Sequence, residues 1–309
     1  MKIVFIGGIK FSHALLSTIL ENNFDVKAVF SYDVSKKTLH SDYASFDSIS
    51  EKYNILLKKI TNINDPENIE ILEKIKPDII LVLGWSQIIK SEILSIPKIA
   101  VIGSHPTELP KYRGRAPIPW SIIKGLKQSA LTLFYIDEGT DHGDILDQVK
   151  FSIEDSDDAN TIYKKITKIG KDMILRNLTL LERNTANRIK QDESKFIENW
   201  KKRTPDDGLI DWNSSAEKIH TLIRATTHPY PGAFTEFKNQ KLIIWKSEFL
   251  NNSIAQSSSN PGIVEEINND NILVGTGKGI LKILKISYQD GNELNKIFST
   301  SDIGTKLGL

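Results

Sequence analysis

The chain has 309 residues, which is enough for two domains with sizeable cores. It carries 40 Lys and Arg against 39 Asp and Glu, so no global field would draw nucleic acid or an acidic membrane to it. The absence of cysteine excludes disulfides, thiolate catalysis and cysteine-ligated metals, and it fits a cytoplasmic location. No apolar run approaches the roughly 18 residues of a membrane span, so we expect no membrane partner.

Short apolar runs alternate with helix-like segments through the first half of the chain. Strands are expected at residues 2–6, 26–30, 78–83 and 99–102, and helices at 11–20, 46–53, 69–75 and 87–94. This alternation favours an α/β fold with a mainly parallel sheet covered on both faces. A strand at 131–136, a polar turn at 137–143, a returning strand at 144–151 and one long amphipathic helix follow.

The pattern changes after a polar stretch at 191–207, which we interpret as a linker. The capping-box pattern Ser214-x-x-Glu217 predicts that a helix begins there. Short strands separated by glycines are expected at 233–237, 242–245, 262–265, 272–274 and 280–286. We therefore expect an α/β domain at 1–190 and a smaller β-rich domain at 208–309.

The segment that follows the strand at 99–102 combines a histidine, His105, with prolines and three cations, Lys111, Arg113 and Arg115. Open α/β sheets bind ligands at the carboxyl ends of their strands, where this segment begins. The cations suit phosphate or carboxylate recognition, but a solvated basic loop would have the same composition. A lone histidine is more often structural than catalytic, so a second group is needed to support catalysis.

The polar turn after the strand at 131–136 supplies such a group, Asp141, between Gly139 and Gly143. An aspartate in a turn can be a simple turn-former. If the two strands are near neighbours, however, the two loops converge, and Asp141 can hold His105 and stabilise its charged form. His105 and Asp141 are therefore a candidate acid–base pair.

Other motifs limit the chemistry. Trp85 and the segment 87–89 could line a slot for a flat heterocycle or belong to an ordinary core. G-x-G-x-x-G is absent after the first strand, which disfavours NAD binding. The remaining histidines have no metal-ligand spacing, so no metal site is expected.

Together these motifs resemble a known family. His105-x-x-x-Leu109-Pro-x-x-Arg113-Gly114, then Pro117, Trp120 and Asp141-x-Gly143-x-Ile145, is similar to the formyltransferases that use N10-formyltetrahydrofolate. Residues 203–212 and 224–234 resemble the second domain of the subgroup that formylates nucleotide-linked amino sugars, among them the 4-amino-4-deoxy-L-arabinose formyltransferases. The resemblance covers nearly the whole chain and implies a Rossmann-like formyltransferase domain followed by an OB-like domain. Methionyl-tRNA formyltransferases share both domains.

The resemblance also implies roles for individual residues. His105 would be the proton-transfer group for the attacking amine, and Asp141 would favour its protonated form and help to deprotonate the amine. The amine would attack the formyl carbon, and the resulting tetrahedral oxyanion would collapse to release tetrahydrofolate. The implied cofactor-binding residues are Gln87, Ile88, Ile89, Arg115, Asp137, Glu138, Gly139, Thr140 and Asp141.

One position departs from the family pattern. Where the family has Asn-x-His, with an asparagine that stabilises the oxyanion, this chain has Gly103. Loss of one such donor typically costs on the order of 10² to 10³ in rate. Either a Gly103 or Ser104 backbone N–H or the Ser104 hydroxyl replaces it, or protonated His105 does both jobs, or the chain is catalytically weak. Glu108 also replaces the usual leucine.

The leading hypothesis is N-formylation of a nucleotide-linked amino sugar by N10-formyltetrahydrofolate, for surface polysaccharide or lipopolysaccharide assembly. The alternatives are methionyl-tRNA formylation, hydrolysis of formyltetrahydrofolate, and a degenerate folate- or nucleotide-binding protein without activity. An enzyme for tRNA should present a basic stripe, which the net charge of +1 does not favour. We expect folate and a nucleotide sugar as partners, no nucleic acid, and a homodimer as one option for assembly.

Overall fold

The structure is a computed structural model that describes residues 1–33, 41–250, 260–268, 271–288 and 298–308. The chain divides into two compact units, of which the first comprises residues 1–117, 127–153 and 163–202. The second comprises residues 118–126, 154–162 and 203–309. The domain boundaries expected at 190 and 208 stay predictions. Among the described residues, no helix is long and apolar enough to cross a membrane.

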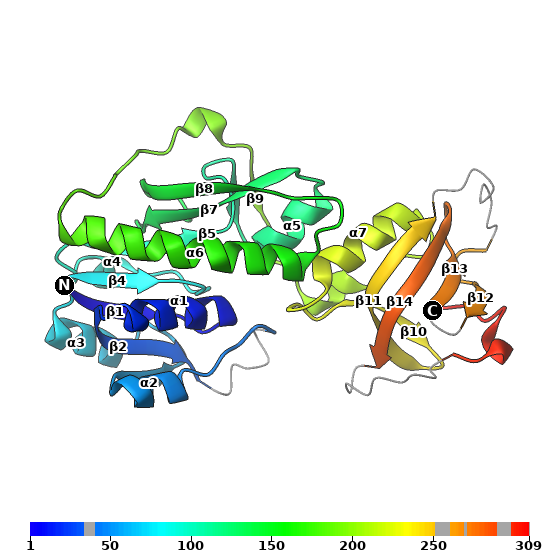
Figure 1. The fold of residues 1–309 in the computed structure, drawn as a ribbon, viewed down its shortest axis with the longest axis horizontal. Coiled ribbons are helices and arrows are strands. Elements are labelled where there is room, and N and C mark those ends of the chain that lie inside the picture. The colour runs from blue at the N-terminus through cyan, green and yellow to red at the C-terminus, as the bar shows by residue number, and fades with distance from the viewer. Residues whose placement is uncertain (34–40, 251–259, 269–270, 289–297, 309) are drawn as a thin grey trace. The chain divides into compact units, whose positions relative to one another are not determined.

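A seven-stranded sheet in the order β3-β2-β1-β4-β5-β7-β8 forms the centre of the first unit (Figure 1). Its five strands β1 to β5 are parallel, whereas β7 is antiparallel to both β5 and β8. This confirms the predicted α/β fold with a mainly parallel sheet. The strands are β1 (Lys2–Ile6), β2 (Asp25–Tyr32), β3 (Leu56–Ile60), β4 (Ile79–Val82), β5 (Ala100–His105), β7 (Gln128–Tyr135) and β8 (Ile145–Ser152).

Helices cover both faces of this sheet (Figure 1). On one face, α3 (Pro66–Ile75) and α4 (Ser91–Leu94) pack on a core that contains Ile6, Phe30 and Val101. On the other, α1 (Lys10–Glu21) and α6 (Ala159–Glu182) meet so closely that a Cβ on Gly170 would lie 3.0 Å from the Phe11 ring. Two further helices are α2 (Asp47–Tyr53) and α5 (Pro117–Ile123).

One local prediction was wrong, and one strand was missed. Residues 87–90 are not helical, and only α4 forms in the segment 87–94. The Gln87 side chain explains this, because its Nε2 donates to Thr61 O (2.6 Å) and its Oε1 accepts from Ile63 N (3.0 Å), which ties the segment to the loop after β3. Strand β3 was not predicted, since it lies at the sheet edge with two lysines and a half-exposed Leu56.

The second unit contains a five-stranded antiparallel sheet in the order β10-β11-β14-β13-β12, against which α7 (Ala216–Thr226) packs. This confirms the predicted β-rich second domain. The helix cap differs by one residue from the predicted one: Ser215 Oγ accepts from Lys218 N, whereas Ser214 Oγ donates to Asp211. The strands are β10 (Ala233–Phe237), β11 (Gln240–Leu250), β12 (Val264–Asn268), β13 (Asn271–Gly275) and β14 (Ile280–Tyr288).

His220 on α7 is a partly buried titratable group in this unit. Its Nδ1 lies 3.0 Å from Ser247 Oγ, and its ring centroid lies 5.4 Å from that of Phe249. Burial, assisted by the positive charge of Arg224, lowers the pKa of His220 from 6.5 to about 4. The folded protein therefore holds this imidazole neutral at pH values where the unfolded chain protonates it.

This shift predicts a loss of stability at acid pH. As pH falls from about 7 toward 4, His220 binds a proton in the unfolded chain but stays neutral in the folded chain. Protonation thus favours the unfolded state, and the free energy of unfolding decreases. H220N removes this titration, and we expect the melting temperature of the variant to fall less between pH 7 and pH 4.5 than that of the wild type. Thermal unfolding at both pH values measures the difference. An equal fall in both proteins would contradict the assignment.

Candidate functional site

The two predicted loops meet, but not by leaving the same edge of the sheet. Because β7 is antiparallel to β5, its end at Tyr135 pairs with Ile102, while His105 pairs with Thr132. The turn after β7 therefore starts near the beginning of β5. The Ile136 side chain packs over Gly103, where a Cβ would lie 2.9 Å from Ile136 Cγ1. A glycine at this position gives the chain room to return toward His105.

His105, at the end of β5, is 5% exposed and has a partner on each ring nitrogen. Its Nε2 lies 3.2 Å from the carbonyl oxygen of Tyr112, and its Nδ1 lies 3.6 Å from Asp141 Oδ2. A carbonyl only accepts, so Nε2 carries the hydrogen and, in the neutral ring, Nδ1 keeps its lone pair. His105 can therefore accept a proton at Nδ1, beside a carboxylate that stabilises the resulting charge.

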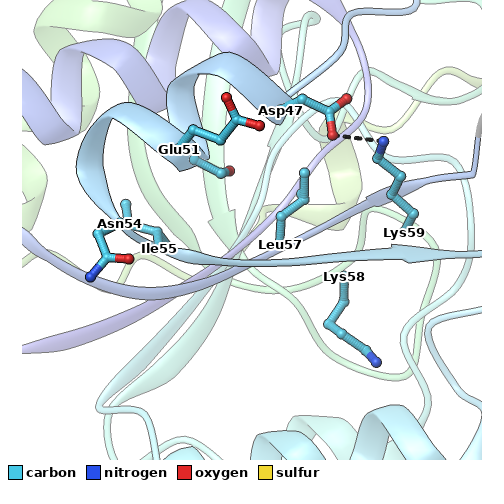
Figure 2. A pocket seen from close by; sticks show the side chains of 8 residues that line it. Asp47, Glu51, Asn54, Ile55, Leu57, Lys58 and Lys59 are labelled. Carbon is cyan, nitrogen blue, oxygen red and sulfur yellow. Dashed lines mark ion pairs between the residues drawn. The ribbon is translucent and has the colours of Figure 1, made fainter.

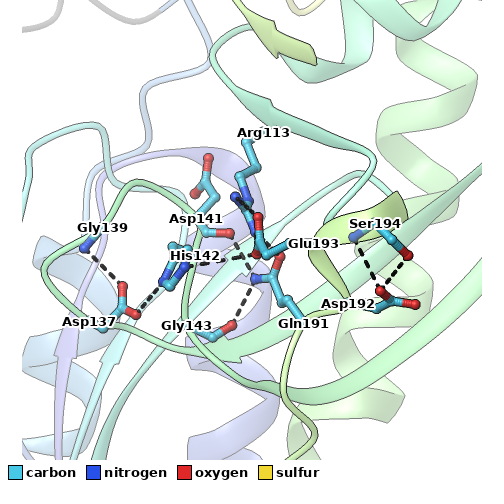
Figure 3. A network of polar contacts seen from close by, with 10 residues as sticks. All are labelled: Arg113, Asp137, Gly139, Asp141, His142, Gly143, Gln191, Asp192, Glu193 and Ser194. Atoms are coloured by element: carbon cyan, nitrogen blue, oxygen red, sulfur yellow. Dashed lines mark hydrogen bonds and ion pairs between the residues drawn. The ribbon is translucent and has the colours of Figure 1, made fainter. Parts of the chain in front are cut away.

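Asp141 is held by contacts at its carboxylate and at its backbone. Gly114 N donates to Asp141 Oδ2 (2.9 Å), and Gln191 Nε2 donates to the Asp141 carbonyl oxygen (2.9 Å). Its φ of +51° places it in the left-handed region, which residues with a Cβ rarely adopt. Figure 3 shows the turn with Asp141 and the Gln191 side chain that contacts it.

Arg113 does not serve as a free anion-binding cation. It lies in the short strand β6 (Tyr112–Gly114), it is buried, and its guanidinium donates to both carboxylate oxygens of Glu193 and to Gln191 Oε1. The hydrogen bonds from Arg113 lower the pKa of Glu193 below its ordinary value. Sequence reasoning missed Gln191 and Glu193, because both fall in the stretch interpreted as a linker and no spacing relates them to Arg113.

Lys111 is also engaged. Glu108 occupies the position where the family has a leucine. Its Oε1 lies 3.0 Å from Lys111 Nζ and 2.8 Å from Lys150 Nζ. Burial raises the pKa of Glu108, but hydrogen bonds from Lys150 and Lys111 outweigh it and leave the pKa below its ordinary value. Of the three cations in the loop, only Arg115 is exposed without an ion pair in the described part of the chain.

The other cofactor-binding predictions fall in two segments. Residues 87–89 follow β4, which is parallel to and paired with β5, so this segment starts at the edge where His105 lies. Within it, Ile88 is 71% exposed and Ile89 belongs to the core. Nearby, Trp85 stacks on Tyr32 with centroids 3.9 Å apart, so one face of its ring is covered.

The second segment is the turn itself, with Asp137, Glu138, Gly139 and Thr140 before Asp141. Asp137 organises it, since its Oδ1 accepts from Gly139 N (2.9 Å) and its Oδ2 lies 2.9 Å from His142 Nδ1 (Figure 3). The Asp137 side chain is thus engaged within the turn. Among the described residues, no group of three or more His, Asp or Glu side chains could hold a metal ion.

An open pocket lies at α2 and β3 (Figure 2). Two of its lining residues form an ion pair, with Lys59 Nζ 2.7 Å from Asp47 Oδ1. None of the predicted site residues lines this pocket. The candidate site is therefore the one around His105, and this pocket has no part in it. The lining residues are Asp47, Ser50, Glu51, Asn54, Ile55, Leu57, Lys58 and Lys59.

Comparison with known proteins identifies the family. The formyl transferase family model matches residues 1–178, and the model of the formyl transferase C-terminal domain matches residues 202–297. Both parts of the chain are therefore covered, and the boundary between the matches lies in the stretch at 179–201.

Two curated relatives illustrate the range of activities. The bifunctional polymyxin resistance protein ArnA of Wigglesworthia glossinidia brevipalpis is 34% identical over 296 residues, which cover 96% of this chain but 44% of ArnA. The methionyl-tRNA formyltransferase of Clostridium novyi is 35% identical over 293 residues, which cover 93% of this chain and 92% of that protein. The chain thus spans less than half the length of ArnA but nearly all of the tRNA enzyme.

Solved structures share the fold. An N-formyltransferase from Helicobacter canadensis, in complex with folinic acid and dTDP-3-aminofucose, superposes with a TM-score of 0.69 at 24% identity, covering 93% of this chain and all of that one. WlaRD, a sugar 3N-formyl transferase with dTDP and 5-N-formyl-THF, gives 0.67 at 24% identity over 95% and 99% of the two chains. Because family models match both domains and relatives exceed 30% identity over nearly the whole chain, this chain belongs to the formyl transferase family, and it is a formyltransferase that uses formyltetrahydrofolate.

Proposed function

We propose that this formyltransferase transfers the formyl group of N10-formyltetrahydrofolate to the amine of a nucleotide-linked amino sugar, for surface polysaccharide or lipid biosynthesis. The observation that carries the chemistry is the buried His105 with Asp141 at 3.6 Å and a free lone pair on Nδ1. Such a pair provides a proton acceptor for a neutral amine that attacks the formyl carbon.

The choice of acceptor rests on charge and on local likeness. From Arg203 to Leu309 the chain has 11 Lys and Arg against 12 Asp and Glu, so the second domain has no excess of positive charge. Phosphate contacts dominate the affinity of proteins for nucleic acid, which makes this balance unfavourable for a tRNA acceptor. The sugar-subgroup likeness of residues 203–212 and 224–234 supports the same choice. Methionyl-tRNA formylation is the second candidate, because relatives at similar identity have that activity.

The proposed reaction begins with attack of the neutral amine on the formyl carbon. The new C–N bond forms as the carbonyl π electrons move to oxygen, and His105 Nδ1 takes the proton that the amine loses. Asp141 stabilises the imidazolium, which returns this proton to N10 of the folate as the C–N10 bond breaks and the oxyanion collapses. The products are the formamide and tetrahydrofolate, with no net proton left on the enzyme.

The geometry favours one of the three accounts of the missing asparagine. Gly103 pairs with Val82 on one side and Phe134 on the other, so its backbone lies inside the sheet. Side chains alternate along a strand, which places Ser104 on the face opposite to His105. We therefore infer that protonated His105 itself stabilises the oxyanion. The intact pair argues against the catalytically inactive alternative.

An acceptor panel tests the proposed function. N10-formyltetrahydrofolate is supplied with several nucleotide-linked amino sugars and, separately, with charged initiator tRNA. We expect turnover with at least one amino sugar and none above background with tRNA, measured as release of tetrahydrofolate. Preferential formylation of the tRNA would overturn the acceptor, and folate binding without any turnover would favour a non-catalytic protein.

Removal of either member of the pair should lower the rate. Acid–base catalysis contributes about 10² to 10⁴ in rate, so we expect H105A and D141N each to reduce kcat by at least about 10²-fold while both variants stay folded. H220N is the matched control, because it alters a partly buried histidine of the second unit, and it should keep kcat within about twofold. Near-normal turnover of H105A or D141N would refute the mechanism.

The family asparagine should not be restorable by a single change. A Cβ at position 103 would lie 2.9 Å from Ile136 Cγ1 and 3.0 Å from Phe134 Cζ, so G103N alone should lower both stability and kcat. I136A provides room for the new side chain. If an oxyanion donor limits the rate, G103N/I136A should exceed I136A in kcat by about 10-fold or more. An increase in kcat for G103N alone would show that Ile136 is no barrier.

A further inference from the structure

We infer that Gln191 is a positioning residue for the proposed formyl transfer, and that its side-chain amide fixes the turn that presents Asp141 to His105. The inference rests on the proposed function of this site. No sequence motif assigned a role to Gln191, and it lies in the stretch interpreted as a linker.

The turn needs an external support. Asp141 adopts φ = +51°, a left-handed conformation that aspartate tolerates better than most residues but that further contacts are needed to hold in one place. Its carboxylate lies 3.6 Å from His105 Nδ1, which is an ion-pair distance rather than a hydrogen bond. The pair therefore depends on contacts that fix the Asp141 backbone.

Gln191 supplies these contacts from a buried position. Its Nε2 donates to the carbonyl oxygen of Asp141 (2.9 Å) and to that of Gly143 (2.7 Å), so one amide group bridges the two sides of His142 (Figure 3). The residue is 5% exposed, and both hydrogens of the amide can be used in this way. A side chain without these donors would leave two carbonyl groups of the turn without this partner.

The orientation of the Gln191 amide is itself fixed. Its Oε1 accepts from Arg113 Nη2 (2.8 Å), and Arg113 is held by both oxygens of Glu193. Because Arg113 only donates, the amide cannot turn over without losing a hydrogen bond. The two Nη atoms of Arg113 are thus engaged within the chain, and one of them orients the residue that holds the turn.

Strand β6 connects this support to both members of the pair. Tyr112 O accepts from His105 Nε2, Gly114 N donates to Asp141 Oδ2, and Arg113 between them orients Gln191. Three consecutive residues therefore bear on the Nδ1–Oδ2 distance. This makes Gln191 part of the geometry of the pair rather than a contact of general stability.

Other charged groups of the turn are already engaged with one another. His142 Nδ1 lies 2.9 Å from Asp137 Oδ2, and His142 Nε2 lies 3.9 Å from Glu193 Oε1. Arg113 is paired with Glu193. None of these ion pairs includes His105, whose ion-pair partner is Asp141.

Q191L tests the inference, with N177L as the matched control. Asn177 on α6 is a 2% exposed amide whose Nδ2 donates to Asp147 Oδ2 (2.6 Å) and Met173 O (2.8 Å), so its loss removes comparable contacts away from the pair. A displacement of about 1 Å can cost 10²-fold in rate, so we expect Q191L to lower kcat about 10- to 100-fold and N177L to leave it within about twofold of the wild type.

The pH profile separates positioning from stability. If Asp141 moves away, the charged form of His105 is less stabilised, and the acid limb of the kcat profile should shift to lower pH in Q191L but not in N177L. E193Q keeps one oxygen acceptor for Arg113 at a half-exposed site and should shift it in the same direction by less. Equal profiles for Q191L, E193Q and the wild type, or equal changes in Q191L and N177L, would overturn the inference.

A readout without turnover keeps the two proposals distinguishable. Hydrogen exchange of the backbone amides at 137–143 should be faster in Q191L than in the wild type and unchanged in N177L. If the wild type formylates no acceptor, the proposed function is wrong. The role of Gln191 in fixing the turn is then tested by the exchange rates at 137–143 alone. Equal exchange in Q191L and the wild type would overturn it. If Q191L does not fold, the same two measurements on E193Q, hydrogen exchange at 137–143 and the pH profile of kcat, test the inference instead.

Discussion

The hydrogen bond from Gly114 N to the Asp141 carboxylate, at 2.9 Å, is the interaction on which the site depends. It exists because β6 pairs with β9 (Glu198–Trp200), and a Cβ on Gly114 would come within 2.4 Å of Trp200 O. With φ = +103°, Gly114 adopts a conformation that only glycine tolerates easily. Strand β9 therefore fixes the position of β6, whose backbone contacts both His105 and Asp141.

Ion pairs divide the charges of the loop. Three cations follow His105 within ten residues, and two of them are paired: Lys111 with Glu108 inside the loop, and Arg113 with Glu193 in the segment after α6. The carboxylate that replaces the family leucine is thus balanced by lysines rather than left beside the substrate. Arg115 is exposed, and the folate contact that the family resemblance implies for it stays a prediction.

The turn after the antiparallel strand β7 packs against the glycine at position 103. An antiparallel neighbour brings the following turn back across the sheet face, and Ile136 then occupies the space of a side chain at 103. The packing of this turn therefore leaves no room for an asparagine side chain at position 103. In the proposed reaction, a chain with this packing stabilises the oxyanion by other means, and we assign that role to protonated His105.

The sequence by itself determined the features that depend on local order along the chain. Hydrophobic periodicity predicted most strands and helices. The two polar segments and their spacing, which resembles a family pattern, predicted that His105 and Asp141 form a pair, and the structure places them 3.6 Å apart. Tertiary structure decided the antiparallel β7, the edge strand β3, the extended segment at 87–90 and the Gln191–Arg113 contact across 78 residues. These features depend on pairing between distant segments, and no local periodicity encodes which segment a strand or a side chain will meet.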